Sequence, residues 1–240
     1  MLASVVGAGV AGVTALLAYS AINDAFKEKV DREIDLQWMQ ASIDAMPKCH
    51  YLAYGSLSLL RPLADTQVIV NATSGEKICE GYNREMETAD PTEHGEVDAM
   101  RNCVKKYTDL GWTPEQIKND LWPNSWIYTT AEPCPMCGAV ILHSGFKRVI
   151  FGTDQPTMRY MGWNEYLVTL RTDWLRRLAL IQPGFGNGRP VTDVLSVGSE
   201  LTDPLLWWQH HAKYPCPAGC HREEGDKVNG VPLCKPDAGQ

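Results

Sequence analysis

The sequence predicts an α/β protein in which helices cover both faces of a mixed sheet. Short runs rich in β-branched residues alternate along the chain with longer stretches of helical periodicity, an order typical of such layered folds. The chain has 240 residues, of which 44% are hydrophobic and 21% are charged. This length and composition fit one ordinary globular domain with a sizeable core and short additional segments.

The first predicted elements are a helix and a β-hairpin. Apolar residues at helical spacing predict a helix over residues 23–46, and Pro47 ends it. The β-branched run at residues 66–72 predicts a buried strand. A turn then returns the chain as a partner strand over residues 77–82.

Helices and strands alternate through the second half of the chain. Pro91 in a first helical turn predicts a helix from about residue 93 to residue 110. A strand at residues 126–130 delivers the chain to a helix that starts at Cys134 and ends near residue 144. Three further elements are expected: a strand at residues 147–152, a helix around residues 163–178 and a strand at residues 193–197.

The N-terminal segment, residues 2–21, is apolar, rich in small residues and uncharged. A signal peptide over residues 1–22 is the first interpretation, and a membrane anchor is the alternative because the stretch is long enough to span a bilayer. Residues 7–12 also match the dinucleotide-binding fingerprint G-x-G-x-x-G. That motif requires a second strand after its helix, and the chain shows a helical pattern there instead.

Eight cysteines are many for a cytosolic enzyme, and six of them lie outside the Cys-x-x-Cys motif described next. These six are Cys49, Cys79, Cys103, Cys216, Cys220 and Cys234. An even number permits disulfides in an oxidising compartment, which together with the N-terminal segment favours the secretory pathway over the cytoplasm. Two interpretations of the C-terminal group stay open. One is a disulfide, and the other is a structural zinc site made of Cys216, Cys220, His221 and Cys234.

The candidate metal-binding and catalytic side chains lie in two short motifs, His94-Gly95-Glu96 and Pro133-Cys134-Pro135-Met136-Cys137. One imidazole and two thiolates are enough for three zinc ligands, and three protein ligands leave the fourth tetrahedral position open, as in a catalytic site. That position can hold a water, which zinc acidifies toward neutral pH. Glu96 stands where a general base and acid is needed. The order H-x-E and then P-C-x-x-C is the signature of the zinc nucleobase deaminases.

Residues 66–155 resemble the cytidine deaminase-like superfamily, in particular its branch of cytosine, guanine and tRNA adenosine deaminases. The resemblance is carried by residues 81–84 (Gly-Tyr-Asn-Arg), residues 90–96 (Asp-Pro-Thr-Glu-His-Gly-Glu) and residues 128–137, which contain the Cys-x-x-Cys motif. It implies a three-layer α/β/α fold with a mixed central sheet. It also implies that Zn²⁺ is the cofactor.

The resemblance assigns roles to six residues. His94, Cys134 and Cys137 would be the zinc ligands, and Glu96 would be the catalytic proton shuttle. Asn83, eleven residues before His94, would hydrogen-bond the substrate ring. The backbone of Gly95 would lie close to the base.

The implied reaction is hydrolytic deamination of a base, with ammonia released after attack by a zinc-bound hydroxide. The net charge of −7 and the pI of about 5.4 disfavour long polyanions as substrates, because phosphate contacts dominate nucleic-acid affinity. We therefore expect a small nucleobase or nucleoside, cytosine-like or guanine-like. Deamination of tRNA adenosine or of single-stranded nucleic acid is one alternative, and a non-catalytic secreted zinc-binding protein is another. The resemblance also suggests a homodimer.

The expected organisation has four parts. Residues 1–22 form the signal peptide or membrane anchor, and residues 23–65 form a helical extension. Residues 66–200 form the zinc deaminase domain, and residues 201–240 form a cysteine-containing C-terminal extension.

Overall fold

The computed structural model describes residues 28–45, 66–161, 171–172, 177, 193–207, 215–216, 219–228 and 231–237. The predicted signal segment, the glycine fingerprint and most of the helix expected at residues 163–178 lie outside the described residues. Two compact units divide the chain, residues 1–37 and residues 38–240. Residues 28–37 of the first unit and residues 38–44 of the second are helical. Both stretches lie within the helix predicted for residues 23–46. In the described part of the chain, no helix is long and apolar enough to cross a membrane.

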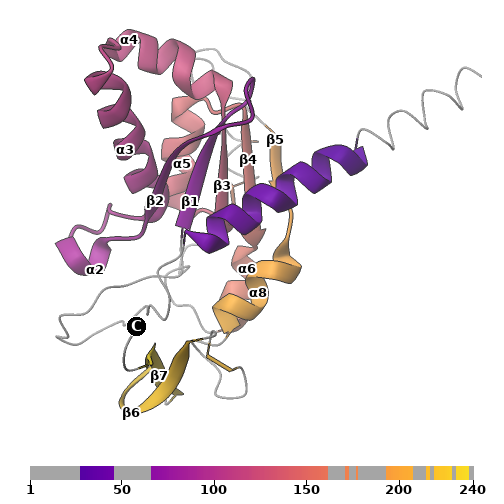
Figure 1. The fold of residues 1–240 in the computed structure, drawn as a ribbon, viewed down its shortest axis with the longest axis vertical. Helices are drawn as coiled ribbons and strands as arrows, with labels where there is room; N and C mark the ends of the chain where they lie inside the picture. The colour runs from indigo at the N-terminus through magenta and orange to yellow at the C-terminus, as the bar shows by residue number, and fades with distance from the viewer. Residues whose placement is uncertain are drawn as a thin grey trace, which may run out of the picture. The chain divides into compact units, whose positions relative to one another are not determined.

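A five-stranded mixed sheet forms the centre of the second unit, in the order β2-β1-β3-β4-β5 (Figure 1). Its strands are β1 (Thr66–Asn71), β2 (Lys77–Tyr82), β3 (Ser125–Ala131), β4 (Arg148–Thr153) and β5 (Asp193–Ser196). β1 pairs antiparallel with β2 and β3, whereas β3, β4 and β5 run parallel to one another. The mixed sheet and all five of its strands confirm the prediction.

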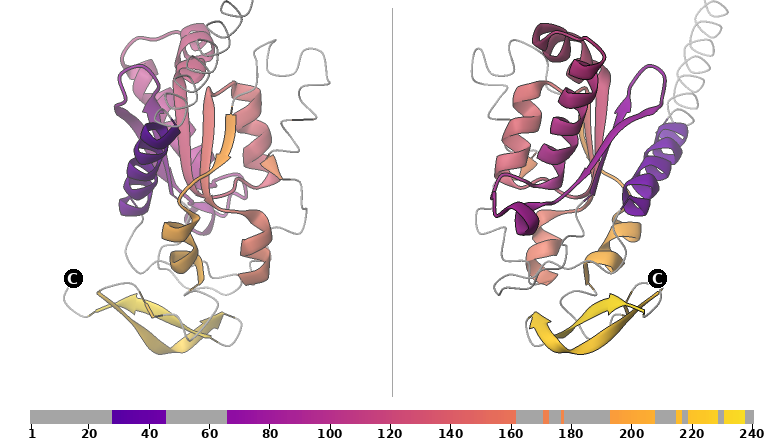
Figure 2. Two further views of the ribbon diagram at one scale, coloured as in Figure 1. Left: turned by 90° about the vertical axis from the view of Figure 1, so that its right-hand side faces the viewer. Right: turned by 60° about the vertical axis from the view of Figure 1, so that its left-hand side comes forward.

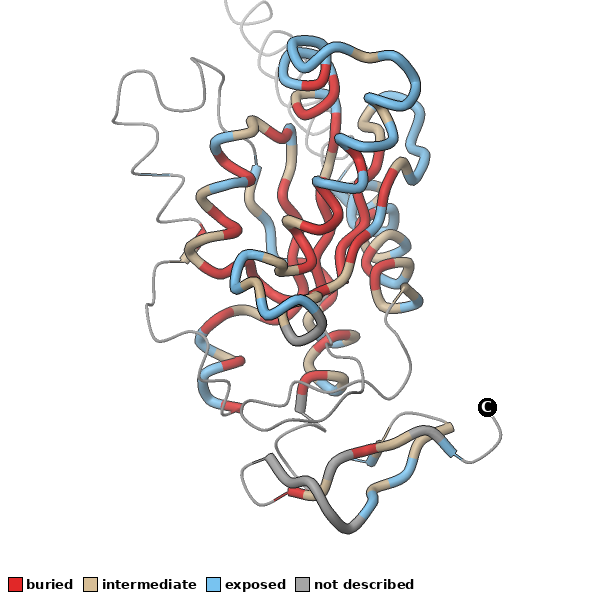
Figure 3. Tube along the Cα trace, turned by 90° about the vertical axis from the view of Figure 1, so that its left-hand side faces the viewer, coloured by how far each residue is buried: buried red, intermediate tan, exposed pale blue. Residues whose placement is uncertain are grey.

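Helices α3 (Gly95–Asp109) and α5 (Pro135–Ser144) cover one face of the sheet (Figure 2). The side chains between them come from alternate positions of the strands. Ile69, Ile127 and Val149 are buried there against Ala99 of α3 and Ile141 of α5. The inner strands β1, β3 and β4 are buried along most of their length, whereas the edge strands β2 and β5 carry exposed residues (Figure 3).

The opposite face of the sheet is covered by residues 38–45 and by α8 (Ser199–Trp207). The rings of Trp38 and Tyr128 pack with their centroids 6.5 Å apart, and the Thr66 hydroxyl donates to the Ser42 carbonyl. α8 packs on β4. The sheet therefore lies between two helical layers, which is the three-layer arrangement that the resemblance implied.

A glycine allows α3 to approach β2 closely. A Cβ atom added to Gly81 would lie 2.6 Å from the Ala99 Cα and 2.8 Å from the Gly95 carbonyl oxygen. Both neighbours are backbone atoms, so side-chain rotation cannot relieve the contact. The end of β2 and the start of α3 are therefore held at a separation that only glycine permits.

The connection between α3 and β3 consists of three short turns of helix, α4 (Pro114–Gln116), η1 (Ile117–Leu121) and η2 (Trp122–Asn124). Trp122 is buried in the core with its ring centroid 5.1 Å from that of Phe146. The connection thus extends the hydrophobic core beyond the end of the sheet.

The sequence patterns did not predict several short elements. These are α2 (Glu85–Thr88), α6 (Gln155–Met161), α8 and the antiparallel pair β6 (Cys220–Val228) and β7 (Val231–Pro236). α2 and α6 are too short to show helical periodicity. α8 contains Pro204, which usually argues against a helix interior. β6 is rich in charged residues, which have low strand propensity.

Among the residues that the structure describes, every cysteine outside the Cys-x-x-Cys motif is disulfide-bonded. Cys79 is bonded to Cys103 and Cys216 to Cys234, and Cys220 is also disulfide-bonded. The disulfide interpretation of the C-terminal group is therefore confirmed. The alternative, a structural zinc held by Cys216, Cys220, His221 and Cys234, is wrong, because sulfurs in disulfides are not available as thiolate ligands.

Candidate zinc centre

Two helix N-termini supply the three predicted zinc ligands. His94 is the N-cap of α3, Cys134 is the N-cap of α5, and Cys137 lies in the first turn of α5. β3 ends at Ala131 and delivers the chain to Cys134 three residues later. α3 and α5 lie side by side on the same face of the sheet, so their N-termini meet at one place (Figure 2).

The distances between the ligand atoms fit a tetrahedral zinc site. One ligand atom from each of His94, Cys134 and Cys137 lies within 4.8 Å of the other two. The Cys134 Sγ lies 3.5 Å from the His94 Nδ1. Zn–S and Zn–N bonds of ordinary length at a tetrahedral angle place the sulfur and nitrogen about 3.5 Å apart. The donor set and its spacing therefore suit zinc.

The surroundings of Cys134 favour its thiolate. A hydrogen bond from the Cys137 side chain has the largest effect, the His94 imidazole and the Cys137 backbone N–H add to it, and together they outweigh burial. The pKa of Cys134 is lowered to about 4. The positive end of the α5 dipole acts in the same direction. The metal-free site therefore favours the thiolate form of Cys134, which is the form that binds zinc.

The predicted proton shuttle is held in the interior beside these ligands. Glu96 lies in the first turn of α3, two residues after His94, and only 1% of its surface is exposed. Gly95 is the first residue of the same helix and is also buried. The Glu96 carboxylate is therefore shielded from bulk water.

Asn83 is connected to His94 through Glu85. Asn83 is only 2% exposed, and its Oδ1 accepts a hydrogen bond of 2.9 Å from the Glu85 backbone N–H. The Glu85 carboxylate faces the His94 Nε2 at 3.7 Å, on the side of the ring away from Cys134. The Asn83 Oδ1 thus accepts from the backbone, and Nδ2 is the donor group of the same amide. A carboxylate on the second nitrogen of a metal-binding histidine orients the ring and raises its basicity.

A second buried carboxylate anchors the loop that carries Cys134. Glu132 accepts backbone hydrogen bonds from Gln155 and Thr172, each of 3.0 Å, and the Arg171 Nε lies 3.4 Å away. The neighbouring Pro133 carbonyl accepts from the Gln155 side chain at 2.8 Å. One short loop therefore gathers segments that lie 23 and 40 residues further along the chain.

Comparison with known proteins agrees with this geometry. Residues 34–153, half of the chain, match the family described as the cytidine and deoxycytidylate deaminase zinc-binding region. The chain belongs to this family. Membership covers both motifs, from His94 to Cys137, and all of the sheet except β5.

Individual deaminases of several substrate classes are similar to the chain. A tRNA-specific adenosine deaminase of Haemophilus influenzae is 34% identical over 52% of this chain and 62% of its own length. A cytosine deaminase of Candida albicans is 32% identical over 37% of this chain and 50% of its own. A guanine deaminase of Bacillus subtilis is 30% identical over 41% of this chain and 57% of its own. The chain thus spans less than two thirds of each of these relatives.

Sequence reasoning did not single out Glu85, Glu132 and Asp98, whose side chains contact His94 or the segments next to the candidate site. Glu85 and Glu132 immediately flank motif residues, and Asp98 stands on the buried side of α3, four residues after His94. A carboxylate on the apolar face of a predicted helix was the available signal for Asp98. The partners of all three depend on tertiary contacts, which spacing along the chain does not reveal.

Proposed function

We propose that the protein is a zinc-dependent hydrolytic deaminase of a small nucleobase or nucleoside, cytosine-like or guanine-like. The observation that carries this proposal is the combination of three clustered ligands with the buried Glu96 beside them. Three protein ligands are typical of catalytic zinc sites, whereas structural sites have four. A buried carboxylate that is not itself a ligand has a use in proton transfer and none in a purely structural site.

Different residues of the site would bind zinc, transfer protons and contact the substrate. His94, Cys134 and Cys137 would hold the zinc, which when bound supplies an acidified water at the open position. Glu96 would take a proton from that water, pass it to the ring nitrogen, and carry the second proton to the departing amine. The Asn83 Nδ2 would donate to an acceptor on the ring, and the Gly95 backbone would lie against the base. The two thiolates would offset the charge of a bound zinc dication, and Glu96 would alternate between its ionised and protonated forms as it moves the two protons.

The pairing of the arginines near the site supports a small substrate. Arg84 lies 3.6 Å from the Asp98 carboxylate, Arg101 is paired with Glu93, and Arg171 lies 3.4 Å from Glu132. An arginine that already neutralises a carboxylate is a poor partner for a phosphate. Together with the net charge of −7, this arrangement disfavours an extended polyanion.

A nucleic-acid substrate is the second candidate, and two observations favour it. The relative with 34% identity is named a tRNA-specific adenosine deaminase. Residues 147–189 also carry more lysine and arginine than aspartate and glutamate. Binding to an anticodon stem-loop that weakens steeply with added salt would support this candidate, because phosphate contacts release counterions.

We also propose that the protein works in an oxidising compartment, where residues 1–22 would serve as a signal peptide or membrane anchor. The support is that Cys79, Cys103, Cys216, Cys220 and Cys234 are all disulfide-bonded. Structural disulfides are rare in proteins that stay in a reducing cytosol. Mass spectrometry of the protein isolated under alkylating conditions, with N-terminal sequencing, tests both statements.

Ammonia release from zinc-loaded protein tests the proposed function. The substrates are cytosine, guanine, adenine, their nucleosides and a tRNA stem-loop. We expect ammonia from at least one free base or nucleoside, and a loss of roughly 10²–10⁴-fold or more in Glu96→Ala. Glu115→Ala makes the same substitution at an exposed position on α4 and should be fully active.

The remaining outcomes decide between the alternatives. Ammonia from the stem-loop alone would favour nucleic-acid deamination. Stoichiometric zinc without ammonia from any substrate would contradict the proposal and favour a non-catalytic zinc protein. Sedimentation velocity on the same preparation tests the homodimer that the resemblance suggests.

A further inference from the structure

A buried carboxylate on α3 has contacts that the proposed chemistry does not use. Asp98 lies one helical turn after His94 and is only 4% exposed. Its backbone N–H donates to the His94 carbonyl at 2.9 Å, so the two residues share the first turn of α3. An ionised side chain in such a position needs strong partners, because an uncompensated buried charge is costly.

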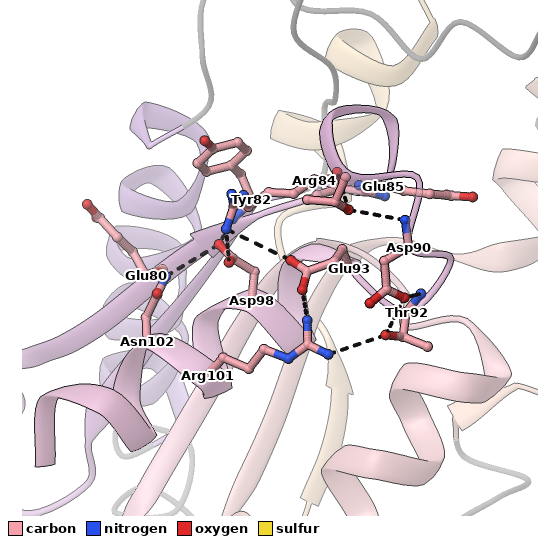
Figure 4. Close-up of polar contacts among 12 residues, drawn as sticks. Glu80, Tyr82, Arg84, Glu85, Asp90, Thr92, Glu93, Asp98, Arg101 and Asn102 are labelled. Carbon is pink, nitrogen blue, oxygen red and sulfur yellow. Dashed lines mark hydrogen bonds and ion pairs between the residues drawn. The ribbon is translucent and has the colours of Figure 1, made fainter. Parts of the chain in front are cut away.

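Two of the partners of Asp98 are the residues on either side of Asn83 in the sequence (Figure 4). The Asp98 Oδ2 accepts from the Tyr82 backbone N–H at 3.2 Å, and the Oδ1 lies 3.6 Å from the Arg84 guanidinium. The Asn102 side chain also donates to the Oδ2 at 3.3 Å. Asp98 therefore holds the chain immediately before and immediately after Asn83.

Further hydrogen bonds between the same elements strengthen this connection. The Arg84 backbone N–H donates to the Glu93 carbonyl at 2.7 Å, directly before His94. The Asn102 side chain donates to the Glu80 carbonyl at 3.0 Å, so α3 also contacts β2 one turn further on. Figure 4 shows these groups as one continuous network along the contact between β2 and α3. Asp98 is the member of this network that contacts both sides of Asn83.

We infer that Asp98 is a positioning residue that fixes Asn83 relative to the helix carrying His94 and Glu96. The inference rests on the proposed function, in which Asn83 contacts the substrate and Glu96 moves protons. β2 and α3 meet without an intervening layer at Gly81, so a small shift of the strand end would displace Asn83 from α3 directly. Misplacement of a substrate-contacting group by about 1 Å is enough to reduce rates by roughly a hundredfold.

Asp98→Asn is the most informative substitution because it breaks one contact and preserves the others. The asparagine oxygen can still accept from the Tyr82 N–H and from Asn102. Its amide group would then face the Arg84 guanidinium, and two donors cannot pair. Arg84→Gln removes the same contact from the other side, at a residue whose side chain is 40% exposed. If Asp98→Asn does not fold, Arg84→Gln still tests the inference.

A double-mutant cycle with Asn83→Ala provides the kinetic test. We expect Asp98→Asn to reduce kcat/KM about tenfold, mainly through KM, while zinc content stays at one per chain. If Asp98 acts through Asn83, the kcat/KM of the double variant, Asn83→Ala with Asp98→Asn, should lie within about twofold of the kcat/KM of Asn83→Ala alone. The inference would be overturned if the reduction in kcat/KM of the double variant equals the product of the two single reductions. A loss of bound zinc in Asp98→Asn would also overturn it. Asp109→Asn, at the exposed end of the same helix, is the matched control and should be fully active.

Hydrogen exchange provides a readout that does not depend on activity. The amide protons of residues 81–85 should exchange at least about tenfold faster in Asp98→Asn and in Arg84→Gln than in the wild type, and Asp109→Asn should leave them unchanged. Unchanged exchange in both variants would overturn the inference. A wild type that releases no ammonia from any substrate would instead refute the proposed function, and the exchange result would still stand on its own.

Discussion

The disulfide between Cys79 and Cys103 should contribute strongly to stability, because it joins β2 to α3. The perturbation is Cys79→Ala with Cys103→Ala. Alanine is preferable to serine here because both cysteines are buried, and a buried hydroxyl would need a hydrogen-bond partner. The proposed zinc ligands Cys134 and Cys137 are left unchanged.

The expected loss follows from the length of the loop that the bond closes. The two cysteines are 24 residues apart, and the chain-entropy relation gives about 3.5 kcal/mol for such a loop. The smaller alanine side chains leave little empty space, which adds about 0.5 kcal/mol. We therefore expect a loss of about 4 kcal/mol, a large share of the 5–15 kcal/mol typical of a domain.

Urea unfolding followed by tryptophan fluorescence measures this loss, with zinc saturating and equal in all samples so that its binding free energy cancels. Cys79→Ala and Cys103→Ala alone should each lose nearly as much as the double variant, because either change breaks the bond. A loss of less than about 1 kcal/mol in the free energy of unfolding of the double variant would refute the reasoning. So would a loss in the double variant that equals the sum of the losses in the two single variants.

Three further predictions concern the contact of α3 with β2, the proposed zinc ligand His94 and the ionisation of Asp203 in α8. Gly81→Ala should lower the free energy of unfolding by about 3 kcal/mol, measured by urea titration, because the added methyl group meets backbone atoms. A loss below about 1 kcal/mol would contradict this close approach. Glu85→Gln should weaken zinc binding about tenfold in chelator competition, the lower end of the usual range, because the carboxylate is 3.7 Å from the His94 Nε2 and 31% exposed. An unchanged zinc affinity would show that Glu85 does not orient the ring. Burial is the main cause that raises the pKa of Asp203 above 3.8. At neutral pH the ionised carboxylate therefore lowers the stability of the folded state. This destabilisation disappears as the pH falls through the raised pKa. Asp203→Asn should therefore raise the melting temperature at neutral pH and have no effect below the unfolded-state pKa of 3.8, and the opposite pH dependence would contradict this sign.

The strands of the sheet, and the clustering of the three predicted zinc ligands, could be expected from the sequence because both depend on local patterns. β-branched runs identify β1 and β3, and the ligands come from two contiguous motifs that each begin a helix. A helix N-terminus is recognisable from its first residues, so the placement of His94 and Cys134 could be expected. The same patterns place Glu96 in the first turn of α3.

The residues that support the site could not be predicted in this way. Asp98 is meaningful only because α3 lies against the end of β2, and that contact depends on Gly81. Glu132 is meaningful only because Gln155 and Thr172 return to it from other parts of the chain. Long-range contacts of this kind leave no periodicity in the sequence.

Ammonia release as a function of zinc occupancy tests the central claim most directly. Zinc-free protein would be titrated with zinc in the presence of the best substrate from the screen, and Glu96→Gln would be titrated in parallel. We predict that the rate rises in proportion to zinc up to one equivalent per chain and then stays constant, while Glu96→Gln binds the same equivalent and releases at least about a hundredfold less ammonia. Ammonia released equally fast without zinc, or by Glu96→Gln at full occupancy, would contradict the claim.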